Sequence, residues 1–139
     1  MTLHIPLIKL PLLLHLLTEI PACLSFLLVP EAQLPRATPE ATLILRNFGG
    51  LLLSTNLIAL LFILRSHFDC LSALVTLCLG AYHIWPIYRA YSRLRDAKLA
   101  QGKKENEKQN KVLGGPVVHF WVHIGCLAAL LLSGWYGLG

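Results

Sequence analysis

The stretch LILRNFGGLLLSTNLIALLFIL, residues 43–64, carries a single charge, Arg46, in 22 residues. An α-helix of about 20 apolar residues crosses the hydrocarbon core of a bilayer, which is about 30 Å thick. Three further stretches have the same character, at residues 7–29, 68–91 and 116–138. The sequence therefore predicts one all-α domain over residues 1–139, an integral membrane antiparallel four-helix bundle.

The composition of the whole chain supports this class. Hydrophobic residues make up 55% of the chain and charged residues 14%, whereas a soluble domain carries roughly 25% charged residues. A cleaved signal peptide is the alternative for the first stretch. That stretch contains Pro11, Glu19 and Pro21 and has no small-residue cleavage site in the right place, so we interpret it as a retained span.

The basic residues are concentrated in one connector. Seven of the twelve Lys and Arg residues lie between Arg93 and Lys111. By the positive-inside rule, the connectors at 30–42 and 92–115 are expected in the cytosol and both termini in the lumen or at the exterior. Basic residues beside membrane spans favour anionic lipid head groups as partners, and no nucleic-acid partner is expected.

Glu19 is the most unusual residue of the first span. Burying an ionisable side chain near the bilayer centre costs at least about 2.5–3.5 kcal/mol, so such a residue usually has a partner or a function. His15 precedes Glu19 by one helical turn and can share a hydrogen bond with it. Pro21 leaves the carbonyl of Leu17 without its helical donor. The first span is thus expected to carry a polar notch, with a kink at Pro21.

The other spans carry polar residues at a matching depth. Counted from one membrane face, Glu19, Asn56, His83 and His123 fall in a single layer. We predict Glu19, His83 and His123 as catalytic residues. Substrate-binding residues are predicted around them, namely His15, Arg46, Asn47, Asn56, Tyr82, Arg89 and His119.

Local patterns add structural expectations. Gly49 and Gly50 permit close helix approach, Pro86 is expected to kink the third span, and Asp69 can cap the start of that span. Trp85, Tyr88 and Tyr91 lie toward a span end, as do Trp135 and Tyr136. Such positions suit the aromatic belts at the membrane interface.

Each polar residue also has a structural interpretation. Glu19 and His15 can form a purely structural buried pair, and Arg46 and Arg89 can extend to lipid phosphates. The spacing of His119 and His123 suits a metal or a haem. The fourth span contains no carboxylate, and the four cysteines are scattered singly with no Cys-x-x-Cys pair, so we expect no metal and no other cofactor.

Two segments carry a resemblance to known proteins. RNFGG at 46–50, followed by Ser54 and Asn56, and GAYHIWPIYRA at 80–90 resemble segments of small four-span fungal membrane proteins of mostly unknown function. The overall plan is more distantly similar to the ergosterol-biosynthesis membrane scaffold family and to DoxX-like four-helix proteins. Resemblance to the scaffold family implies residence in the endoplasmic reticulum beside enzymes that act on sterol-like lipids.

Two functions remain open from the sequence. The first is a small membrane cyclase or isomerase that binds an apolar metabolite, such as a terpenoid, sterol or polyketide, in lipid or secondary-metabolite biosynthesis. An apolar pocket disfavours the charged form of a carboxyl, so Glu19 would stay protonated and could donate its proton to an alkene, epoxide or carbonyl of the substrate. A neutral His83 or His123 would then remove a proton from the substrate to end the reaction. The second is a noncatalytic scaffold that tethers biosynthetic enzymes at the endoplasmic reticulum.

Overall fold

The computed structural model describes residues 6–34, 36–100 and 114–139. The first span consists of the 3₁₀ turn η1 (Leu7–Lys9) and helix α1 (Leu10–Leu28). A second 3₁₀ turn, η2 (Pro30–Ala32), precedes α2 (Pro39–Leu64). The third span is divided into α3 (Cys70–Tyr82) and α4 (Ile84–Ala100), and α5 (Gly115–Tyr136) is the fourth. Part of the basic connector, residues 101–113, lies outside the described residues.

Four helical segments are long and apolar enough to cross a membrane, namely Leu7–Leu28, Pro39–Leu64, Cys70–Lys98 and Gly115–Tyr136. Large apolar side chains on their outer faces are exposed, including Leu51, Leu61 and Leu132. A hydrocarbon solvent fits such faces better than water does. The prediction of an all-α, four-span membrane bundle is therefore confirmed. Its orientation, its membrane compartment and its description as a single domain stay predictions.

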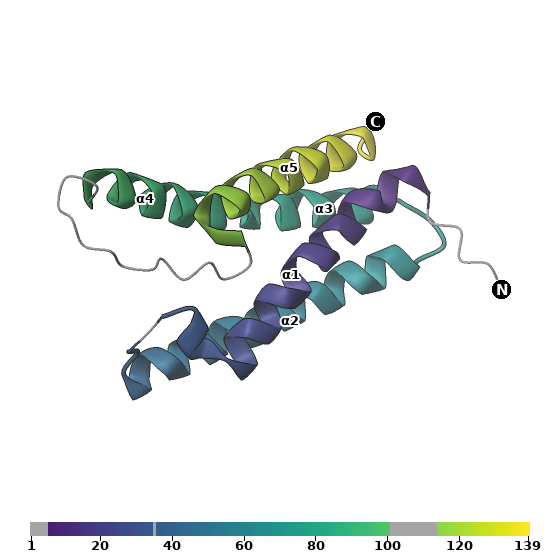
Figure 1. Ribbon diagram of the computed structural model, residues 1–139. Helices are drawn as coiled ribbons and strands as arrows, with labels where there is room; N and C mark the ends of the chain where they lie inside the picture. The colour runs from purple at the N-terminus through teal and green to yellow at the C-terminus, as the bar shows by residue number, and fades with distance from the viewer. Residues whose placement is uncertain (1–5, 35, 101–113) are drawn as a thin grey trace.

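The helices pack as two pairs, α1 with α2 and α3–α4 with α5. The pairs lie close together near the start of α1 and the end of α5 and diverge toward the other end of the molecule (Figure 1). Two hydrogen bonds from side chains of the first span to backbone carbonyls of α2 join these two spans. The Cys23 thiol donates to the Gly49 carbonyl at 3.3 Å, and the Lys9 ammonium donates to the Ile63 carbonyl at 3.3 Å.

The two predicted glycines of α2 have different environments. A Cβ atom at Gly49 would lie 2.9 Å from Leu27 Cγ and 3.0 Å from Phe26 Cβ, whereas one at Gly50 would meet nothing within 4 Å. Gly49 therefore permits the close approach of α1, and Gly50 does not contribute to it.

The third span is interrupted at His83. Pro86 has no N–H, so the carbonyl of Tyr82 loses its normal helical donor. The chain tightens there, with His83 N donating to Gly80 O at 3.0 Å, and resumes with Ile87 N donating to His83 O at 3.1 Å. The expected distortion near Pro86 is thus present as a break between α3 and α4. By contrast, α1 continues as one helix through Pro21.

The turn between α2 and α3 is held by Asp69. Its carboxylate accepts hydrogen bonds from the backbone N–H of Ser72 at 2.9 Å and from Arg65 at 2.6 Å. This confirms Asp69 as the N-cap of α3. The turn lies at the same end of the molecule as the start of α1 and the end of α5 (Figure 1).

Candidate functional site

Three histidines from three segments form a connected chain inside the bundle. His15 Nδ1 on α1 lies 3.0 Å from His83 Nε2, at the break between α3 and α4. His83 Nδ1 in turn lies 2.8 Å from His123 Nδ1 on α5. The side chains of His15 and His83 are fully buried, and His123 is 9% exposed. Both ring nitrogens of His83 are therefore engaged by other imidazoles.

Glu19 lies beside this chain of histidines. Its Oε1 atom is 3.5 Å from His123 Nδ1 and 3.7 Å from His83 Nδ1. Its Oε2 atom accepts a hydrogen bond from the Tyr82 hydroxyl at 3.1 Å. The side chain is 1% exposed, and Oε1 is buried without a hydrogen-bond partner in the described part of the chain. The structure thus brings the three residues predicted as catalytic, Glu19, His83 and His123, into one cluster.

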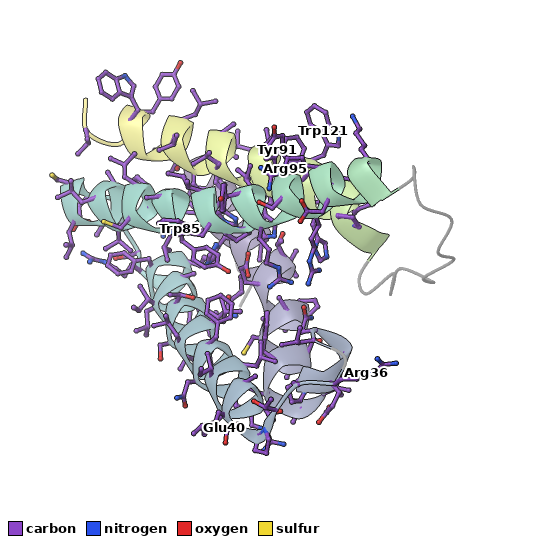
Figure 2. All side chains as sticks on the ribbon, turned by 90° about the vertical axis from the view of Figure 1, so that its left-hand side faces the viewer. Arg36, Glu40, Trp85, Tyr91, Arg95 and Trp121 are labelled. Carbon is purple, nitrogen blue, oxygen red and sulfur yellow. The ribbon has the colours of Figure 1, made fainter. Side chains whose placement is uncertain are left out.

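A cavity of about 290 Å³ opens next to the cluster. It lies between α1 and α2 on one side and α4 and α5 on the other, where the two helix pairs diverge (Figure 1). Its apolar wall includes Phe26, Phe48, Trp85, Val118 and Val122. Trp85 projects from α4 on the side that faces the α1–α2 pair (Figure 2). The cavity is large enough for a small ligand and is mostly apolar, as such sites usually are.

Polar side chains lie at the cavity wall beside this apolar surface. Those that the sequence predicted are Glu19, Tyr82, Arg89, His119 and His123. Two of them are linked, since the His119 and His123 rings lie edge to face with centroids 6.2 Å apart. His15 and His83 do not line the cavity and reach it only through His123 and Glu19.

Three of the predicted substrate-binding residues lie elsewhere. The side chains of Arg46 and Asn47 are exposed, and neither lines the cavity. Asn56 is buried, with both side-chain polar atoms lacking a hydrogen-bond partner among the described residues. The pairings of Cys23 with Gly49 and of Lys9 with Ile63 place Asn56 level with Leu16, near His15 in depth. A role in substrate binding stays a prediction for all three.

Gln33, in the connector after η2, is a site residue that the sequence did not reveal. It is 7% exposed. Its side-chain oxygen accepts a hydrogen bond from Arg89 at 2.9 Å, and its side-chain amide donates one to the Ser25 hydroxyl at 2.9 Å. Its backbone carbonyl accepts a hydrogen bond from Arg93 at 3.4 Å. Arg89 also lies 5.6 Å from the centre of the Phe26 ring, a cation–π distance. Gln33 therefore holds two arginines at the cavity wall, and no periodic pattern marks such a connector residue in advance.

The cluster also has the composition of a metal site. His15, Glu19 and His83 offer nitrogen and oxygen atoms that all lie within 4.8 Å of one another. Neutral imidazole and carboxylate are common ligands of divalent transition metals.

Comparison with known proteins gives no further assignment. No family model matches the chain, and no curated protein or solved structure matches it. The four long apolar helices agree with the resemblance to small four-span membrane proteins, and membership of a particular family stays a prediction.

Proposed function

We propose that this membrane protein binds an apolar metabolite in the cavity between the two helix pairs and converts it by proton transfer. The observation that carries the proposal is the position of Glu19. Its carboxyl lies in an apolar-walled cavity, is held by Tyr82, and is 3.5 Å from an imidazole that also lines that cavity. A carboxyl acid and an imidazole base in one mostly apolar site are the groups that acid-initiated isomerisation or cyclisation needs.

The proposed reaction uses one acid and one base. Glu19, in its protonated form, donates its proton to an alkene, epoxide or carbonyl of the substrate. His123 accepts a proton from a neighbouring carbon, so the substrate gains and loses one proton and the product is an isomer. The imidazolium of His123 then passes the proton on its Nδ1 atom to the Glu19 carboxylate, whose Oε1 atom lies 3.5 Å away. Once the product has left, water takes the proton from Nε2 and returns one to Nδ1, which restores the starting form of His123. Apart from water, no external acid, base or oxidant is required.

The direction of hydrogen bonding along the histidine chain decides whether His123 can act as the base. A neutral imidazole has one N–H donor and one acceptor nitrogen. When His83 donates from Nε2 to His15, its Nδ1 must accept from the Nδ1–H of His123. The Nε2 atom of His123 is then the unprotonated nitrogen and can act as the base. His83 and His15 are thus positioning residues.

The arginines favour a substrate with an acidic group at one end. Arg89 and Arg93 line the cavity, and no ion pair joins either of them to a carboxylate of the described residues. A guanidinium presents a planar fork of donors that matches a carboxylate or a phosphate. A terpenoid, sterol or polyketide acid would place its apolar body on Phe26 and Phe48 and its acidic group at Arg89.

The test is Glu19→Gln, which keeps the shape of the side chain and removes the acidic proton. Lipid extracts of cells that express the wild-type chain, the variant or no chain are compared by mass spectrometry at matched protein level. We expect an isomer that only wild type produces, with its rate of formation reduced about 10²–10⁴-fold in the variant. Glu40→Gln is the matched control, since Glu40 is exposed at the outer end of the α1–α2 pair (Figure 2). An unchanged profile with Glu19→Gln would eliminate acid catalysis and favour the scaffold function.

A further inference from the structure

Three donor atoms of the cluster form a triangle of the size that a metal ion requires. Glu19 Oε1 lies 3.5 Å from His123 Nδ1 and 3.7 Å from His83 Nδ1, and the two nitrogens lie 2.8 Å apart. Zinc binds imidazole nitrogen and carboxylate oxygen at about 2.0–2.2 Å, so the ligands of a tetrahedral ion lie about 3.3–3.5 Å from one another. The two oxygen–nitrogen separations, 3.5 and 3.7 Å, are close to this value, whereas the two nitrogens, at the hydrogen-bonding distance of 2.8 Å, would move apart on binding the ion.

We propose that Glu19, His83 and His123 bind one divalent transition-metal ion. Two imidazoles and one carboxylate are the protein ligands of many catalytic zinc and non-haem iron sites, which keep further positions open. This donor set favours Zn²⁺, Fe²⁺ or Co²⁺ over Mg²⁺ and Ca²⁺, which prefer sites made of oxygen alone.

The surroundings of the triangle support a ligand there. Glu19 Oε1 is buried and makes no hydrogen bond within the described part of the chain, which is unfavourable for a polar atom in an apolar interior. A metal ion between the three residues would satisfy this oxygen. The second oxygen of the same carboxyl is already held by the Tyr82 hydroxyl at 3.1 Å, as the outer oxygen of a metal-bound carboxylate often is.

His15 holds the second ring nitrogen of His83. Its Nδ1 atom lies 3.0 Å from His83 Nε2, on the side of the His83 ring away from the triangle. A metal-bound histidine usually donates its other N–H to such an acceptor, which fixes the tautomer and the ring orientation. His15 is therefore a positioning residue of the metal site and not a ligand.

The site adjoins the cavity. Glu19 and His123 both line it, so a free coordination position of the ion lies next to the bound molecule. This inference rests on the residues of the proposed function. Glu19 cannot hold the metal ion and the transferable proton at the same time. A metal-loaded chain can no longer donate that proton, and Zn²⁺ should inhibit the isomerisation.

The test is metal binding by the full chain, purified in detergent and stripped with a chelator. We titrate it with Zn²⁺ and, separately, with Co²⁺, whose visible absorption bands report tetrahedral coordination. Wild type is expected to bind one ion per chain at micromolar concentration. Glu19→Gln, His83→Ala and His123→Ala should each weaken binding by more than about 100-fold, and His15→Ala by about 10–100-fold.

Two control variants test whether His67 or His119 binds the ion instead. His67→Ala removes an exposed histidine of the α2–α3 turn and should leave binding unchanged. His119→Ala tests the pair His119 and His123, which lies on one helical face. If His119→Ala abolished binding and His83→Ala did not, that pair would be the site and the proposal would be wrong.

A final measurement does not depend on the folding of any variant. X-ray absorption of the zinc-loaded wild type should count two imidazoles and at least one oxygen ligand. Failure of wild type to bind Zn²⁺ or Co²⁺ stoichiometrically would overturn the metal site and leave the acid-base function untouched. Binding accompanied by faster turnover would support the metal site and overturn the role of Glu19 as proton donor.

Discussion

The Nδ1 atoms of His83 and His123 lie 2.8 Å apart, although the two residues are 40 positions apart in the chain. The contact depends on the break between α3 and α4, because His83 stands at the junction that Pro86 creates. A short stretch of 3₁₀ geometry inside a helical span often marks a hinge or local strain. Here it lets one imidazole contact both α1 and α5.

This contact predicts different effects for the two histidines. His123 lines the cavity and His83 does not, so only His123 can take a proton from the substrate. We expect His123→Ala to lower the rate of isomer formation about 10²-fold or more. His83→Ala should lower it less, because water can occupy the space and hydrogen-bond to His123 Nδ1. Rates are measured in membranes at matched protein level, and equal losses for both variants would argue against His123 as the base.

Arg89 should determine affinity for the acidic group of the substrate. Its guanidinium makes no bond to the groups proposed to transfer protons, so its removal should raise KM and leave kcat nearly unchanged. A charge-assisted hydrogen bond contributes about 1.5–3 kcal/mol, so Arg89→Ala should raise KM about 10–100-fold. Arg89→Lys should recover part of this loss. Arg95→Lys, at an exposed position of α4, is the control, and a fall in kcat alone for Arg89→Ala would contradict a binding role.

The pair Gly49 and Gly50 allows a matched test of packing. An alanine methyl group at position 49 would overlap Leu27 and Phe26, whereas one at position 50 would enter open space. Overpacking typically destabilises by about 1–3 kcal/mol, and replacing an unconstrained helical glycine by alanine can stabilise by up to about 1 kcal/mol. Gly49→Ala should therefore lower the melting temperature in detergent, and Gly50→Ala should leave it unchanged or raise it. Similar melting temperatures for both would contradict the close contact of α1 with Gly49.

The sequence predicted the spans well because length and hydropathy are local properties. The stretch at 43–64 ends at the same residue as α2, although α2 begins earlier, at Pro39, where Thr38 supplies an N-cap. Glu19, His83 and His123 were also predicted together, because helical rise converts sequence position into depth. Depth also placed Asn56 in this layer, whereas the structure puts Asn56 level with Leu16 and away from the cavity.

The partners within that layer depended on helix rotation, which sequence position does not give. Glu19 was expected to pair with His15 on its own helix. In the structure His15 contacts His83, and Glu19 accepts a hydrogen bond from the Tyr82 hydroxyl. Arg46 was predicted to bind substrate from near one end of the second span, yet it lies on an exposed face of α2. The metal triangle could not be predicted for the same reason, because its three ligands lie on separate segments of the chain.

Lys9 illustrates a structural role that its sequence position concealed. It lies at the start of the first span, yet its side chain is only 2% exposed. Its ammonium donates to the backbone carbonyls of Ile63 and Arg65 at the end of α2. The last carbonyls of a helix lack intrahelical donors, and a cation there also complements the helix dipole. Lys9 therefore joins the start of the first span to the end of the second by hydrogen bonds.

Replacing Lys9 should loosen this end of the bundle without altering its hydrophobic surface. Lys9→Met keeps the length of the side chain but removes the donors, leaving two carbonyls at the end of α2 without their bonds to Lys9. Hydrogen bonds from a charged group contribute about 1.5–3 kcal/mol, so the variant should unfold at a clearly lower temperature in detergent. Lys98→Met, at an exposed position of α4, should not. Because Lys9 does not line the cavity, zinc affinity at low temperature should stay that of wild type. A variant as stable as wild type would show that water satisfies these carbonyls and that the end of α2 does not depend on Lys9.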